Sequence, residues 1–280
     1  MRAIVKLAAF ALLALFLIVM GSAVVVRLRE AANRARCQNN LRQVGWFAVW
    51  DYTDRQSAFP GGKDSRNRPW QLPDEAQPKP DRLFPPGTLS NPHLPPEERL
   101  SWQVILLPHL GKEPLQNRFD LSQGWQADAN QEAIRTFMPV FVCPTSYQPV
   151  PADSAARSYY IGMAGYGTDA PKLPQTDPRA GFFRYDDPTK TGSLSRGFSY
   201  TMTIIETTND LGPWAAGGPS SVRGLDPQSS PYVGIGRPFG GAHLDGAYAS
   251  FADGSVRLLN RKISPDVFEA SVTLTDRSEK

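Results

Sequence analysis

The feature that most constrains the fold of this chain is a run of twenty uncharged residues near its start, residues 7–26. An α-helix rises about 1.5 Å per residue, so a run of this length can cross a hydrocarbon core of about 30 Å. No proline interrupts the chain between this run and Gly45. The sequence therefore predicts one long helix whose first half is a transmembrane helix over 7–26, with residues 1–6 as a cytoplasmic N-terminus.

The second half of this helix, residues 27–55, changes to an amphipathic pattern. Small and apolar side chains recur at helical spacing, while the arginines fall on other faces. We expect this stem to pack under a folded domain formed by residues 56–280. The predicted buried stripe consists of Leu28, Ala31, Ala32, Ala35, Leu41, Val44, Gly45, Ala48 and Tyr52.

A cleavable signal peptide is the alternative interpretation of the N-terminus. Arg2 and Lys6 precede the apolar run, and small residues occur at 21–23, as at a cleavage site. The run is longer than the apolar region of a usual signal peptide, which favours an uncleaved anchor. Orientation stays open on charge, because more arginines follow the run than precede it, and this count alone would place the domain in the cytoplasm.

The net charge of +3 is concentrated at the start of the chain. Residues 1–60 hold eight basic and three acidic side chains, so 22 basic and 24 acidic groups remain in the rest. A nucleic-acid-binding domain needs a basic face, and this near-neutral remainder argues against that class of partner. The early arginines suit lipid headgroups instead, so the lipid bilayer is the predicted partner.

The two cysteines lie on segments that a disulfide would usefully join. Cys37 is on the stem, and Cys143 ends the apolar run 138–143, which we interpret as a buried strand. A bridge between them would close a loop of about a hundred residues and stabilise the fold by roughly 2–4 kcal/mol. The alternative is two unrelated buried thiols, since sequence alone does not verify the geometry.

The remaining segments predict an α+β domain rich in loops. Residues 59–98 contain ten prolines and predict an extended surface excursion, either a solvated loop or a binding loop, with Glu97 and Glu98 starting a helix at its end. Asp253-Gly254 between two apolar runs predicts a β-hairpin. The other predicted elements are helices over 101–110 and 130–136, strands over 140–142 and 199–207, an apolar stretch at 159–165, and a closing helix capped by Ser264.

Three motifs together resemble the bacterial pseudopilin-like family called domain of unknown function 1559. They are AANRARCQNNLRQVG after the apolar run, FVCPTS, and His243 followed nine residues later by Asp253-Gly254. The similarity touches residues 27–53, 101–110, 138–165 and 199–274. It implies a type IV pilin-like plan, with a half-embedded helix packed on an antiparallel sheet and the domain outside the cytoplasmic membrane. An oxidising compartment would also permit the Cys37–Cys143 bridge.

The chain departs from pilins at the processing site. Pilin-like members begin with a Gly-Phe-Thr-Leu-Ile-Glu type junction, whose glutamate pairs with a neighbouring subunit, whereas this chain begins MRAIVKLAAFALLALF. We therefore expect a monomeric or loosely associated relative, in contact at most with other pseudopilin-like envelope proteins. Pilus assembly is not implied.

Candidate chemistry centres on His243. Together with Asp245 and Asp253 it could bind a metal or do acid–base work, but Asp253 and Gly254 also have the plain role of shaping a hairpin turn, and we interpret the motif as structural. Glu206 ends an apolar strand, either as a buried carboxylate or, as is commoner for a strand end, facing solvent. The sequence predicts no catalytic residue, cofactor or metal. His93 and His109 form no cluster with His243 in the sequence.

Three functions stay open at this stage. The first is a membrane-anchored, non-enzymatic pseudopilin-like envelope protein. The second is an extracytoplasmic glycan- or solute-binding module that would use the aromatic residues of its loops. The third is a metal-dependent hydrolase, which requires His243, Asp253 and Glu206 to converge. The aromatic residues in question are Trp70, Trp125, Trp214 and Tyr232.

Overall fold

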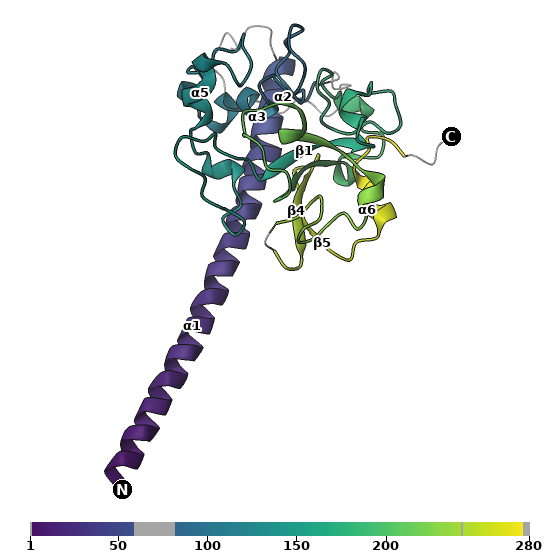
Figure 1. Ribbon diagram of the computed structural model, residues 1–280. Coiled ribbons are helices and arrows are strands. Elements are labelled where there is room, and N and C mark those ends of the chain that lie inside the picture. The colour runs from purple at the N-terminus through teal and green to yellow at the C-terminus, as the bar shows by residue number, and fades with distance from the viewer. Residues whose placement is uncertain (1, 59–81, 242, 277–280) are drawn as a thin grey trace.

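A computed structural model describes residues 2–58, 82–241 and 243–276. It begins with helix α1 (Arg2–Arg42), which continues through a π-helical turn, η1 (Gln43–Ala48), into α2 (Val49–Ala58). This confirms the predicted long helix. Figure 1 shows α1 as a rod that leaves the domain and carries the N-terminus far from it.

The structure does not show that this helix crosses a membrane. Over the part of the chain that the structure describes, no helix is both long and apolar enough to cross a membrane. Several side chains of the predicted transmembrane segment 7–26 lie outside the described residues. The segment therefore stays a prediction.

The stem is buried over a shorter length than predicted. Cys37, Leu41, Val44 and Val49 are almost fully buried, whereas Leu28 is 64% exposed. The reason is that the domain first meets the helix through polar groups, and its apolar core begins about two turns later. The prediction was wrong for the small residues at the start of the stripe, all exposed: Ala31, Ala32 and Ala35.

Five strands form one sheet in the order β3-β1-β2-β4-β5. The predicted antiparallel sheet is wrong at one edge, because β3 runs parallel to β1 while the other pairs are antiparallel. The long connection after β2 brings the chain to the far side of β1, where β3 runs in the same direction as β1. The strands are β1 (Tyr160–Tyr166), β2 (Met202–Glu206), β3 (Val222–Leu225), β4 (Gly246–Phe251) and β5 (Val256–Asn260).

The two faces of the sheet pack on different helices. Successive strand residues point to opposite faces, so Ile204 joins the core under the stem while Ile205 joins the core around Phe268 of α6 (Pro265–Ser271). The stem approaches the sheet very closely, since a Cβ built on Gly45 would lie 2.1 Å from the Ser250 Oγ. Only glycine permits this contact between η1 and β4.

The predicted helix starts are confirmed, and one predicted strand is wrong. Ser101 and Ser264 each accept a hydrogen bond from a backbone N–H in the first turn of α3 (Trp102–Ile105) and of α6. Residues 140–142 form no strand, because Pro139 starts a 3₁₀ turn that extends to Phe141. The helix predicted over 101–110 is interrupted, because α3 ends at Ile105 and a separate 3₁₀ helix, η2 (Pro108–Leu110), follows. Two more short α-helices are α4 (Glu113–Gln116) and α5 (Asp128–Ile134), the second of which confirms the helix predicted near 130.

The Pro-rich excursion is not wholly a surface loop. Phe84 is fully buried, and its ring centroid lies 5.2 Å from that of Trp50 and 4.6 Å from that of Phe182. Exposing the large apolar surface of the Phe84 ring to water would cost free energy, so this part of the excursion packs into the core. Glu97 and Glu98 lie in a turn and start no helix, so that prediction was wrong. Residues 59–81 lie outside the described residues.

Candidate functional site

The disulfide predicted between the stem and the domain is present. Cys37 of α1 and Cys143, just after the 3₁₀ turn, are bonded, with their Cα atoms 4.9 Å apart. Both side chains are at most 1% exposed. The bond fixes the first buried turn of the stem to the loop that leads towards β1, so the helix and the sheet are joined covalently where their apolar contact begins.

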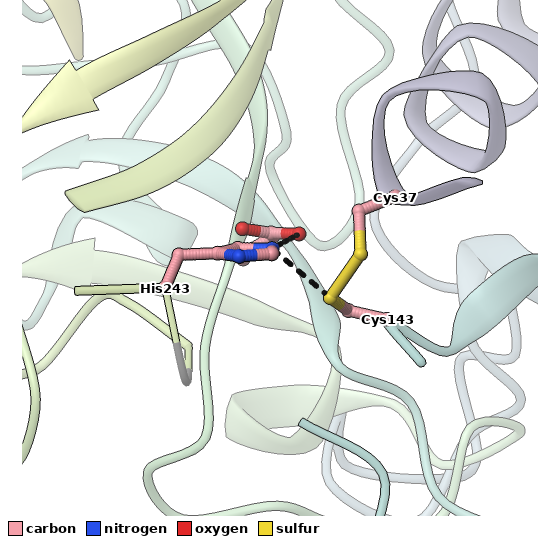
Figure 2. A group of neighbouring side chains, drawn as sticks. Cys37, Cys143 and His243 are labelled. Atoms are coloured by element: carbon pink, nitrogen blue, oxygen red, sulfur yellow. Dashed lines mark hydrogen bonds and ion pairs between the residues drawn. A yellow bond between two sulfur atoms is a disulfide. The ribbon is translucent and has the colours of Figure 1, made fainter. Parts of the chain in front are cut away.

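Two further polar side chains converge on this bond. Glu206 ends β2 and His243 precedes β4, and both are as buried as the sulfurs. One ligand-type atom from each of the four residues lies within 4.8 Å of every other. Figure 2 shows the His243 ring pointing at the disulfide. We call this set the His–Glu–disulfide cluster; it consists of Cys37, Cys143, Glu206 and His243.

The His243 ring is oriented from both sides. Its Nδ1 lies 3.4 Å from the Glu30 Oε1 on α1, and its Nε2 lies 3.3 Å from the Cys143 Sγ and 3.8 Å from the Glu206 Oε1. A carboxylate only accepts, so the contact with Glu30 places the ring proton on Nδ1. The Nε2 lone pair then faces the cluster.

Glu30 is itself held by a charged neighbour. The Arg34 guanidinium donates to the Glu30 Oε1 at 3.0 Å and to the Asp245 Oδ2 at 3.1 Å. These three groups are partly exposed and close the cluster on its solvent side. The stem therefore supplies both a sulfur and the carboxylate that orients the imidazole.

Glu206 is an unusual group for the interior. Its Oε2 accepts the backbone N–H of Tyr248 at 2.9 Å, but its Oε1 has no hydrogen-bond partner among the described residues. Burial raises the pKa of Glu206 to about 8, against the smaller opposing effect of the Tyr248 N–H. Burial also lowers the pKa of His243, with Glu30 opposing it. Near neutral pH both groups are therefore uncharged while the disulfide is intact.

Asp253 and Gly254 lie at the other end of β4 from His243. The Asp253 Oδ1 accepts from the backbone N–H and the hydroxyl of Ser255, and Gly254 has a φ of +81°. β4 has six residues and spans about 20 Å. His243 and Glu206 thus meet as a metal-dependent hydrolase would require, but Asp253 does not join them.

The other histidines lie outside the cluster. His93 is exposed on a loop, and the His109 Nδ1 lies 2.8 Å from the Asp51 Oδ2 of α2. Of the two interpretations of Glu206, the commoner one, a strand-end carboxylate facing solvent, was wrong, because the side chain is fully buried. Sequence reasoning missed Glu30, whose only sequence signal was its i,i+4 spacing from Arg34 on the stem.

The predicted aromatic binding residues are mostly structural. Trp214 and Tyr232 are at most 3% exposed, so neither presents a ring to a ligand, and that prediction was wrong for both. Trp125 is partly buried, and its indole N–H donates to the Glu97 carbonyl. Trp70 lies outside the described residues.

The fold and the cluster define a class of protein: an α+β domain on a long helical stem, joined to it by a buried disulfide. The chain belongs to the family described as Protein of unknown function (DUF1559), whose model matches residues 27–225. The resemblance predicted from the motifs is thus confirmed. The match includes Cys37, Cys143 and Glu206 and ends before His243. No curated protein and no solved structure is significantly similar to the chain.

Proposed function

We propose that the protein is a membrane-anchored, non-enzymatic envelope protein of pseudopilin-like plan, held in the cytoplasmic membrane by the first half of α1. The observation that carries this proposal is the exposure of that half. Its described large apolar side chains from Phe10 to Val26 are 46–76% exposed, and the domain covers none of them. Exposed apolar surface on this scale marks a site of contact with a membrane or another protein.

The disulfide supports placing the domain outside the cytoplasm. Disulfides persist in oxidising compartments and are rare among cytosolic proteins. The arginine count favours the opposite orientation. We give the disulfide more weight, because Cys37 and Cys143 form a buried bond that ties stem to domain.

The pilin-like part of the proposal rests on the way one helix serves two roles. The stem half of α1 packs on one face of the sheet, and the other half projects free. Within residues 7–26 the apolar run holds no glutamate that could pair with a neighbouring subunit. The protein then displays its domain at the membrane surface as a monomer or in a loose association.

The second candidate, a glycan- or solute-binding module, is favoured by one surface feature. Phe137 and Tyr147 are 49% and 42% exposed, with ring centroids 5.3 Å apart, and they line a cavity of about 170 Å³. Ligand sites usually measure about 300–1,000 Å³. This hollow accepts a fragment rather than a whole sugar or solute. A second hollow, of about 360 Å³, is large enough for a ligand but is lined by no Phe, Tyr or Trp ring, so the envelope anchor is the better supported function.

A matched pair of variants tests the anchor. Leu15→Arg with Ile18→Arg places two charges on the exposed half of α1, where each costs about 2.5–3.5 kcal/mol in a membrane. Leu244→Arg with Val267→Arg changes two domain side chains of similar exposure, 66% and 60% against 57% and 67%. We expect only the first pair to move the protein from the membrane fraction to the soluble fraction. Equal fractionation of both pairs would contradict the anchor.

Protease treatment of spheroplasts then tests orientation. A tag at the C-terminus should be digested in intact spheroplasts if the domain lies outside the cytoplasm. A tag that is digested only after lysis would reverse the proposed orientation while leaving the anchor itself intact.

A further inference from the structure

In the disulfide-bonded structure, one oxygen of the buried Glu206 carboxyl has no hydrogen-bond partner among the described residues. A buried acceptor that lacks a hydrogen bond costs about 1–3 kcal/mol, and the Glu206 Oε1 is such an acceptor at 0% exposure. It lies 3.8 Å from the His243 Nε2, whose other contact among the described residues is the Cys143 Sγ at 3.3 Å. The Glu206 Oε1 and the His243 Nε2, two atoms that could act as metal ligands, thus lie next to each other and to the two sulfurs.

Two distances around the His243 Nε2 match those of a tetrahedral metal site. With metal–ligand distances of about 2.0–2.3 Å, the ligand atoms of tetrahedral zinc lie about 3.3–3.8 Å from one another. The His243 Nε2 lies 3.3 Å from the Cys143 Sγ and 3.8 Å from the Glu206 Oε1. The two sulfurs depart from this geometry because they are bonded to each other, and the four ligand atoms as a set lie within 4.8 Å of one another.

We propose that the His–Glu–disulfide cluster, once its two sulfurs are reduced, binds one divalent cation of the zinc class. Two thiolates, an imidazole and a carboxylate are ligand types that zinc takes in proteins, and four protein ligands make a closed, structural site. This inference goes beyond the proposed function and does not depend on where α1 lies. It makes the disulfide and the cation two alternative ways to join stem and domain.

The disulfide form and the cation-bound form interconvert by a two-electron reduction or oxidation of the two sulfurs. A dithiol reductant supplies two electrons and two protons, the S–S bond breaks, and the reductant becomes a disulfide. Cation binding then releases both thiol protons and any proton on Glu206, while His243 contributes its Nε2 lone pair. In reverse, a disulfide-class oxidant removes two electrons from the thiolates, the S–S bond forms, and the cation leaves.

The stem also provides the outer support that metal-binding histidines have. A ligating imidazole usually donates its other N–H to a carboxylate, which fixes the tautomer. Glu30 is in that place at the Nδ1 of His243, and Arg34 holds Glu30. Glu30 is therefore a positioning residue, and Glu30→Gln should weaken the cation about tenfold without removing it.

The test uses the full chain in detergent micelles, with zinc as the probe. Protein reduced with a phosphine, which is converted to its oxide with water as the oxygen source, is compared with disulfide-intact protein by competition against a chromogenic chelator. We expect one zinc per reduced chain and none per oxidised chain. His243→Gln and Glu206→Gln should each lower the affinity by at least about tenfold. His93→Gln, at an exposed histidine outside the cluster, should not change it.

Cobalt provides a spectroscopic signature, because thiolate–cobalt charge transfer appears only when sulfur is a ligand. Zinc should also raise the unfolding midpoint of the reduced chain but not that of Cys37→Ala/Cys143→Ala. The proposal is overturned if the reduced chain binds no zinc, whether it is folded or unfolded. It is equally overturned if zinc binds with the same affinity after His243→Gln and Glu206→Gln, because two thiols alone would then account for it.

Discussion

The two ends of β4 hold the stem by different means. β4 runs beside the stem in the same direction: His243 contacts Glu30 before the strand begins, and a Cβ on Gly254, after it ends, would lie 2.2 Å from the Trp46 ring. Near this second end the Trp50 indole N–H donates to the Ala252 carbonyl. The spacing of His243 to Asp253-Gly254 is thus the length of strand that separates two attachment points on one helix.

The difference lies in what each attachment depends on. The histidine end depends on chemical state, because its groups can be oxidised, reduced or protonated. The Asp253-Gly254 end depends on shape, because it combines a positive φ with the absence of a side chain against Trp46. Changes of redox state, or of pH near neutrality, should therefore act at one end, and changes of side-chain volume at the other.

The largest expected effect is the loss of the disulfide at the histidine end. Cys37 and Cys143 are 106 residues apart, and the chain-entropy model gives about 4.7 kcal/mol in the free energy of unfolding for a loop of that size, above the roughly 2–4 kcal/mol typical of disulfides. Cys37→Ala/Cys143→Ala should lose an amount in this range in urea unfolding of the full chain in micelles. Wild-type protein that is reduced in the presence of a chelator serves as its control and should unfold at a similar urea concentration. A loss below about 1 kcal/mol would show that this end is held mainly by its other contacts.

A smaller effect is expected at the turn end from Gly254→Ala. Gly111 provides a matched control, because it also has a positive φ, +67° against +81°, but no atom lies within 4 Å of its Cβ position. Both substitutions cost the backbone strain of about 1 kcal/mol, and only Gly254→Ala also collides with Trp46, adding about 1–3 kcal/mol. A double-mutant cycle with Trp46→Ala measures that added part. Equal losses of stability at Gly254 and Gly111 would show that the contact with Trp46 adds nothing to the cost of Gly254→Ala.

The sequence predicted the elements that are determined by residues close together in the chain. The uncharged run, the Asp253-Gly254 turn and the Ser264 cap each specify an element from adjacent residues, and all three elements are present. The strand predicted over 140–142 failed because the pattern of apolar residues outweighed Pro139, which starts a turn.

The long-range parts could not be read from the sequence in the same way. His243 and Glu30 are 213 residues apart, and no periodicity relates them. The parallel edge of the sheet depends on β3, a four-residue strand with little apolar alternation inside a long loop segment. The cluster and the mixed sheet both arise from tertiary packing, which a single sequence does not record.

The pH dependence of stability should sharpen the comparison further. The pKa of Glu206 is about 8 in the folded chain and 4.5 ordinarily, so between these values the unfolded chain loses a proton that the folded chain keeps. The free energy of unfolding therefore falls as pH rises, by at most about 1.4 kcal/mol per unit, and levels off above pH 8. The lowered pKa of His243 acts in the opposite sense below its ordinary 6.5, so the slope is measured between pH 6.5 and 8.

Several groups surround Glu206 in this experiment, and a variant isolates its contribution. Glu206→Gln should abolish the slope in disulfide-intact protein, while Gly254→Ala at the other end should leave it unchanged. A slope that persists in Glu206→Gln would have to come from another neighbour. The other titratable or charged groups that face Glu206 and His243 are Glu30, Arg34, Tyr160, Asp245 and Tyr248.

The smallest effect is expected at the rim of the histidine end. Arg34 and Asp245 are paired at 3.1 Å, but their side chains are 34% and 56% exposed, so solvent and salt screen the pair. Exposed pairs contribute about 0.2–1 kcal/mol, and Asp245→Asn should cost no more than that in urea unfolding at low salt, and less at high salt. Asp153→Asn, at an exposed residue of a turn, controls for the loss of a surface charge. A larger, salt-insensitive loss at Asp245 would mean that Arg34 orients Glu30 and His243 only when both carboxylates are present, which would extend the chemical attachment out to the protein surface.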